Sequence, residues 1–122
     1  MSRTAASAKR AGRGMNQLVA DYLASQLGDD RIEQRKLSGA LDRGDVGGVR
    51  VNGQKVVVEV KDYGGRYEVG SWLGEAETER VNDGAAVGLV VAKRRGKGDP
   101  GDQVVFMTLR DLVSLINGSR PE

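Results

Sequence analysis

The stretch Gly44-Asp-Val-Gly-Gly-Val-Arg-Val-Asn-Gly-Gln-Lys-Val-Val-Val-Glu-Val-Lys61 decides the fold of this 122-residue chain. Asn52-Gly53, near its middle, is the strongest short sequence pattern for a two-residue hairpin turn, so we expect strands over 46–51 and 54–61. The second strand is a run of valines from 56 to 60, interrupted only by Glu59. Such an apolar run predicts a central strand rather than one open to water.

Two acids and a lysine in this stretch form the candidate site. Side chains alternate along a strand, so Glu59 and Lys61 share one face. A regular ladder closed by the two-residue turn sets Asp45 opposite Val60, on the wrong face. We therefore predict an irregularity, either a bulge at Gly47-Gly48 or a three-residue turn, that brings Asp45 onto the face of Glu59.

Asp45, Glu59 and Lys61 together can hold a hard divalent cation and activate water beside it, which is chemistry that hydrolyses phosphodiesters. The alternative is a solvated strand on which Glu and Lys merely alternate. The apolar surroundings of Glu59 and the glycines around Asp45, where the backbone must bend, favour the site. We expect the acids Glu75, Glu77 and Glu79 to form a solvated helix face instead.

Composition narrows the possible chemistry. The chain has no histidine and no cysteine, which excludes histidine acid–base catalysis, disulfides and ordinary zinc sites. The lack of cysteine suits a reducing cytoplasm, and we see neither a membrane span nor a secretion signal. We expect a flexible basic arm over 1–13, one domain over 14–118 and a short tail over 119–122.

The remaining patterns complete a mixed α/β domain of order α-β-β-β-α-β-β-α. Helices are expected from about residue 14 to Gly28, from Ser71 to Asn82 and after Thr108, which can cap the last one with Asp111 three residues on. Weak alternation suggests a strand at 31–37, and further strands are predicted at 86–92 and 104–107. The buried face of the last helix is expected to comprise Leu109, Leu112, Val113 and Ile116.

This arrangement resembles the PD-(D/E)XK nuclease superfamily. Gly44-Asp45, followed by Glu59-Val60-Lys61 behind an N-terminal helix, is similar to the superfamily motif, and the predicted order contains its α-β-β-β-α-β core. Gly12-Arg-Gly-Met-Asn16 and Ser38-Gly39 resemble the archaeal-type Holliday-junction resolvases and their phage-encoded relatives. The resemblance covers about residues 9–95 and implies a restriction-endonuclease-like fold in a bacterial or phage-infected cell.

The resemblance also implies roles for individual residues. Asp45, Glu59 and the Val60 carbonyl would ligate Mg²⁺ or Mn²⁺, and Lys61 would orient water or stabilise developing charge. Ser38 would touch the scissile phosphate, or else simply serve a turn. Many relatives carry a glutamate on the first helix where this chain has Asn16, with Gln17 beside it. Either amide is a possible accessory group for a metal-bound water, or Asn16 merely lies near the helix start.

Basic residues are the expected phosphate contacts, unless they serve only as solubilising charge. The candidates are Arg10, Arg13, Arg35, Lys36, Arg43, Lys93, Arg94 and Arg95. The resemblance implies a homodimer that makes paired incisions in four-way DNA junctions, with apolar residues of the second helix as candidate dimer surface. The alternatives are a nicking or repair-type nuclease without junction preference and a non-catalytic DNA-binding module.

Overall fold

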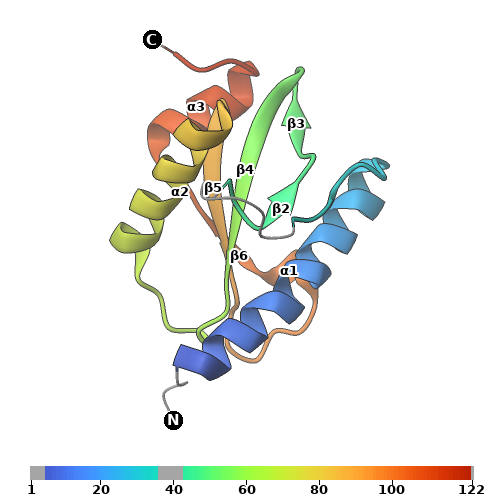
Figure 1. Ribbon diagram of the computed structural model, residues 1–122, viewed down its shortest axis with the longest axis vertical. Helices are drawn as coiled ribbons and strands as arrows, with labels where there is room; N and C mark the ends of the chain where they lie inside the picture. Colours follow the sequence, from blue (N-terminus) through green and yellow to red (C-terminus); the bar gives the residue numbers. More distant parts are fainter. Residues whose placement is uncertain (1–4, 36–42, 122) are drawn as a thin grey trace.

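A computed structural model describes residues 5–35 and 43–121, with side chains from residue 14 onward. Within these residues a six-stranded mixed sheet is flanked by three α-helices (Figure 1). In chain order the elements are α1 (Ala5–Leu27), β1 (Glu33–Gln34), β2 (Val46–Gly47), β3 (Arg50–Val51), β4 (Gln54–Lys61), α2 (Val69–Asp83), β5 (Val87–Ala92), the 3-10 helix η1 (Pro100–Asp102), β6 (Val104–Phe106) and α3 (Leu109–Asn117).

The sheet is built around β4. Its strand order is β1-β2-β4-β5-β6, and β3 also pairs with β4. β4 and β5 are parallel and joined through α2, whereas the other pairs are antiparallel. The prediction that the valine-rich strand is central is therefore confirmed.

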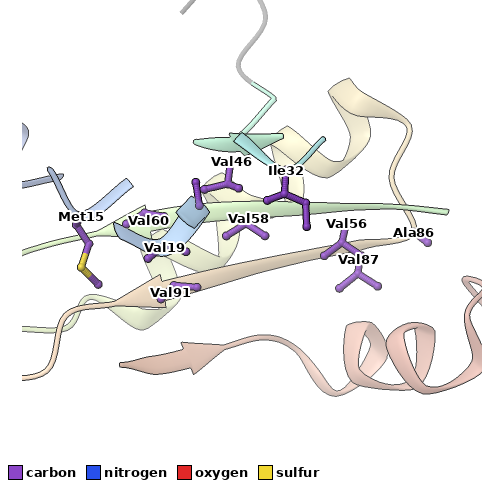
Figure 2. Close-up of a cluster of buried hydrophobic side chains, with 11 residues drawn as sticks. Met15, Val19, Ile32, Val46, Val56, Val58, Val60, Ala86, Val87 and Val91 are labelled. Atoms are coloured by element: carbon purple, nitrogen blue, oxygen red, sulfur yellow. The ribbon is translucent and has the colours of Figure 1, made fainter. Parts of the chain in front are cut away.

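Two helical layers cover opposite faces of the sheet. Met15 and Val19 of α1 pack on the face formed by Val56, Val58 and Val60 (Figure 2). On the other face, Trp72 and Ala76 of α2 pack with a second group of apolar residues, Val90, Ala92, Val104, Phe106 and Tyr63. Because side chains alternate along β4, Glu59 and Lys61 lie on the α2 face.

Helix α1 begins earlier than expected. It starts at Ala5, so the predicted boundary between a flexible arm and a helix near residue 13 was wrong. Alanine, lysine and arginine have high helix propensity, and a basic composition alone did not distinguish a helix from an arm. The end at Gly28 is confirmed, because Gly28 adopts φ 61° and the next amide returns to the carbonyl of Ala24. No described helix is both long and apolar enough to cross a lipid bilayer.

Helix α3 turns an unexpected face to the protein. The Thr108 hydroxyl accepts a hydrogen bond from the Asp111 amide, as predicted for the cap. The buried residues of the helix are Asp111 and Ser114, whereas Leu109 and Ile116 are 76% and 75% exposed. The expected apolar buried face was therefore wrong, and Leu112 and Val113 are also exposed.

A polar contact explains this orientation of α3. The Asp111 carboxylate accepts a hydrogen bond of 2.9 Å from the amide of Gly88 in β5 and one of 2.7 Å from Arg120. Gly88 precedes the residues of β5 that pair with β6. Asp111 thus supplies the acceptor that a longer strand β6 would have offered, and this bond turns the polar side of α3 inward.

Candidate metal centre

A one-residue change of register occurs between the turn and the candidate site. Val51 pairs with Gln54 next to the turn, whereas Val46 pairs with Val58 further along. An uninterrupted ladder would have paired Val46 with Glu59. The predicted irregularity is confirmed, and it is a bulge around Gly47 and Gly48 rather than a longer turn.

The glycine at position 48 is required by this bulge. Gly48 has φ 90°, and a Cβ atom there would lie 2.3 Å from the carbonyl oxygen of Arg31. The turn itself stays at two residues, with positive φ at both Asn52 and Gly53. The change of register is therefore associated with the close approach of Gly48 to the backbone of Arg31, and the turn does not cause it.

The bulge brings the first two predicted ligands onto one face. The Asp45 amide donates to the Val58 carbonyl, and Oδ2 of Asp45 accepts a hydrogen bond of 2.7 Å from the Val60 amide. The Asp45 and Glu59 carboxyl groups are in contact. Asp45, Glu59 and the backbone of Val60 therefore meet at one point, across two adjacent strands.

Helix α2 adds two carboxyl groups that we did not predict. One carboxylate oxygen each from Glu59, Glu75 and Glu79 lies within 4.8 Å of the others. Glu59 is 6% exposed and Glu79 only 3%, so the expected solvated face was wrong for Glu79. Glu77 does lie on the outer side, where it pairs with Arg80.

The position of Glu79 was available from helical spacing. Trp72, Ala76 and Glu79 recur at intervals of four and three residues, which is the spacing of one buried helix face. An acid that continues an apolar stripe is a stronger indication of a buried site than an acid in a charged run.

Lys61 completes the group as a cation. Its Nζ lies 2.6 Å from Oε2 of Glu75, and its side chain is half-buried. Burial alone would lower the pKa of Lys61, but the hydrogen bond to Glu75 and the electrostatic attraction of the neighbouring acids outweigh it and raise the pKa. Lys61 is therefore an ammonium at neutral pH and can stabilise negative charge, but it cannot accept a proton.

The electrostatics of Glu59 favour a bound cation. Burial raises the pKa of Glu59 far above its ordinary range, and the neighbouring carboxyl groups of Asp45 and Glu79 raise it further. Within the described part of the chain, Oε2 of Glu59 is buried and accepts no hydrogen bond. A buried acidic cluster with an unsatisfied oxygen can hold a metal ion, because a cation can replace the proton that these surroundings otherwise impose.

The first helix carries the two accessory candidates. Gln17 is exposed, and its side-chain amide donates to Asp21, four residues further along α1. Asn16 is buried on α1, and its Oδ1 has no hydrogen-bond partner among the residues that the structure describes. Lys36 and Ser38 lie outside the described residues, as do the side chains of Arg10 and Arg13.

The loop after β5 lies beside the site. The Lys93 amide donates to the carbonyl of Lys61, so the ends of β4 and β5 lie together. The Lys93 ammonium donates to the carbonyls of Arg94 and Lys97 and thereby closes its own loop. The side chains of Arg94 and Arg95 are exposed at this edge, where each also donates to a backbone carbonyl.

The two remaining basic candidates, Arg35 and Arg43, differ in their contacts with the rest of the protein. The Arg35 guanidinium donates to the carbonyl of Arg43 at 2.8 Å and lies 3.5 Å from the Asp83 carboxylate. This side chain therefore joins the end of α2 to the segment before β2. Arg43 itself is exposed.

Comparisons with protein-family models, with curated proteins and with solved structures found no match for this chain. Its function therefore has to be inferred from the chemistry of the site.

Proposed function

We propose that the chain is a metal-dependent DNA endonuclease. The observation that carries this proposal is the bulge that places Asp45 beside Glu59, with the charged Lys61 on the same face of β4. Two carboxylates and a fixed ammonium at one point suit phosphodiester hydrolysis, and they have no evident structural purpose on a central strand. The finer assignment, a restriction-endonuclease-like fold with junction-resolving activity, rests on the sequence resemblance.

The residues present fit a hard divalent cation such as Mg²⁺, with Mn²⁺ as a substitute. Asp45 and Glu59 would hold it, together with the Val60 carbonyl that the resemblance implies. When bound, such an ion polarises a phosphate and makes water more acidic. The hydrogen bond from the Val60 amide fixes the orientation of Asp45, and the Lys61 ammonium stabilises the negative charge that grows on the phosphate.

The loop from 93 to 97 supplies the phosphate contacts in this proposal. Arg94 and Arg95 are exposed on the edge at which β4 ends. DNA that reaches Lys61 would pass this edge, so its flanking phosphates would meet both guanidinium groups. Binding through the backbone in this way selects shape rather than sequence, as a junction-specific enzyme requires.

The proposed homodimer has a better candidate surface than the one expected from the sequence. Trp72 and Ala76 of α2 are buried in the core and cannot form it. The exposed apolar face of α3 comprises Leu109, Leu112, Val113 and Ile116. An exposed cluster of large apolar side chains on one helix face is typical of a protein–protein contact surface.

The exposed face of α3 is also self-complementary. Leu109 and Ile116 lie equally far from the point midway between Leu112 and Val113. Antiparallel pairing about a two-fold axis would place Leu109 against Ile116 of a second copy and Leu112 against Val113. A pair of identical chains would carry two sites, as paired incision of two strands requires.

The decisive experiment compares a labelled four-way junction with a linear duplex of the same sequence, in Mg²⁺ and in EDTA. The variants are Asp45→Asn and Lys61→Met, with Lys55→Met as a matched control on the same strand. We expect metal-dependent, paired incision of the junction by the wild type and the control, and a loss of at least about 100-fold in both site variants.

Other outcomes separate the alternatives. Equal cutting of both DNAs supports a nicking or repair-type nuclease without junction preference. Salt-sensitive binding with no cleavage in Mg²⁺ or Mn²⁺ means that the chain is a DNA-binding module, and the nuclease proposal is then wrong.

A further inference from the structure

We propose that α2 builds a second cation position, at which Glu59, Glu75 and Glu79 hold a hard divalent cation. This inference deepens the proposed metal-dependent function and rests on it for its purpose, although the binding itself needs no DNA. Asp45 approaches Glu59 from β2, whereas Glu75 and Glu79 approach it from α2. Glu59 thus lies between two groups of ligands and can serve both.

The spacing of the oxygen atoms suits one ion. The three carboxylate oxygens lie within 4.8 Å of one another. Oxygens on opposite sides of a bound ion are about 4.2 Å apart for Mg²⁺ and up to about 5 Å apart for Ca²⁺. The three glutamates therefore need little movement to contact a single cation.

A separate observation points to a ligand at this position. Oε2 of Glu59 is buried and accepts no hydrogen bond within the described residues. Leaving a carboxylate oxygen desolvated and unpaired is unfavourable. A cation bound between Glu59 and the α2 glutamates would satisfy this atom.

The charges around the position also favour a cation. Four carboxyl groups, those of Asp45, Glu59, Glu75 and Glu79, meet in this cluster, and the ammonium of Lys61 contacts one of them. A cation bound at Glu75 would take over the charge that Lys61 balances there. Lys61 would then be available to a phosphate at the neighbouring Asp45–Glu59 position, so occupation of the second position would prepare the first.

The test is the stoichiometry of Mn²⁺ binding, measured without DNA from the electron paramagnetic resonance signal of free Mn²⁺. We expect two bound ions in the wild type and one in Glu79→Gln, which replaces a buried carboxyl group by an amide of nearly the same volume. Asp45→Asn should also retain one ion, because it affects the other position. Glu77→Gln is the matched control and should keep two, since Glu77 lies on the outer side of the same helix.

Each outcome of this experiment either supports or contradicts the second cation position. Should Glu79→Gln fail to fold by circular dichroism, Glu75→Gln serves in its place, because the Glu75 side chain is 46% exposed and tolerates the change. Wild-type protein that binds one ion or none, or two ions that survive both α2 variants, overturns the second position. DNA cleavage by protein with one bound ion refutes this position alone, whereas two bound ions without any cleavage refute the nuclease and leave the position intact.

Discussion

Asp45 and Val60 are joined across two strands by a hydrogen bond of 2.7 Å from the Val60 amide to the Asp45 carboxylate. The bond uses a main-chain donor of the strand that also carries Glu59 and Lys61. It holds Asp45 at a fixed height along β4 and so fixes its distance from the other site residues. The bond exists because the β2–β4 ladder is shifted by one residue.

The glycine in the bulge should therefore be sensitive to a single methyl group. Gly48→Ala combines positive φ with a Cβ atom 2.3 Å from the Arg31 carbonyl oxygen, and we expect it to lower the free energy of unfolding by about 3 kcal/mol. Gly53→Ala is the control: φ is also positive there, but no atom lies within 4 Å, so it should lose about 1 kcal/mol. Urea unfolding measures both, and equal losses would contradict the close contact.

Metal-free protein should become less stable as the pH rises. Burial, together with the carboxyl groups of Asp45 and Glu79, raises the pKa of Glu59 in the folded protein. The stability from a protonated Glu59 is complete below its unfolded pKa of about 4.3 and is lost progressively as the pH rises toward the folded value. In EDTA, the free energy of unfolding should therefore fall between about pH 5 and about pH 9, by at most about 1.4 kcal/mol per pH unit. The melting temperature should fall over the same range.

Glu59→Gln isolates the contribution of this residue to the pH dependence. The amide resembles the protonated acid and does not titrate, so the melting temperature of the variant should vary less over the same pH range. A wild-type melting temperature that rises with pH, or a variant with the same slope as the wild type, would show that Glu59 is ionised in the folded protein. Added Mg²⁺ should raise the melting temperature of the wild type at high pH and leave that of Glu59→Gln nearly unchanged.

The exposed arginines after β5 should determine the salt dependence of DNA binding. Each guanidinium that contacts a phosphate contributes about one unit to the slope of log affinity against log salt concentration. The double substitution of Arg94 and Arg95 by alanine should lower the slope by about two units without changing the metal stoichiometry. Arg31→Ala is the control, because Arg31 is exposed but pairs with Asp29. An unchanged slope in the double variant would place the DNA elsewhere.

The stability of α3 should depend on its polar side. Asp111→Ala leaves the buried Gly88 amide without its acceptor and removes the partner of Arg120, so we expect a loss of about 2–4 kcal/mol. Leu109→Ala should lose less than about 0.5 kcal/mol, because Leu109 is largely exposed. Denaturation is measured at a concentration where the chain is monomeric. A larger loss for Leu109 than for Asp111 would restore the apolar buried face that the sequence pattern indicated.

The same leucine should matter for association. Leu109→Asp places a charge in the exposed apolar face of α3 and should convert a dimer into a monomer, as measured by sedimentation velocity. Val81→Asp is the matched control, because Val81 is 62% exposed on α2, the helix first expected to form the dimer. Wild-type protein that sediments as a monomer at every concentration, or a dimer dissociated only by Val81→Asp, would exclude the α3 surface.

The central hairpin and its bulge followed from local rules. Asn52-Gly53 determines the turn, valines determine the central strand, and the mismatch in face between Asp45 and Glu59 required an extra residue. All of this information lies within eighteen consecutive residues. Backbone geometry limits how residues close in sequence can be arranged, so a short sequence pattern is enough to predict the turn, the strand and the bulge.

Other features of the site and of α3 depend on contacts between residues that are distant in the sequence. Helical spacing indicates that Glu79 continues the apolar stripe of α2, but only the folded structure shows that it lies beside Glu59 of β4. The inward side of α3 is set by the Gly88 amide, a backbone group that no side-chain pattern records. The contact of Arg35 with Asp83 likewise joins residues that are far apart in the sequence.

The parallel pairing of β4 and β5 has a consequence for how this protein can change. Both strands end at one edge, but Lys61 ends the first and the loop beginning at Lys93 follows the second. Insertions or deletions in that loop would reshape the surface presented to a ligand while the carboxylates stay on their own strands and helix. In the proposed nuclease, different parts of the chain would therefore carry DNA recognition and metal binding, and a change of DNA partner would not require a new metal site.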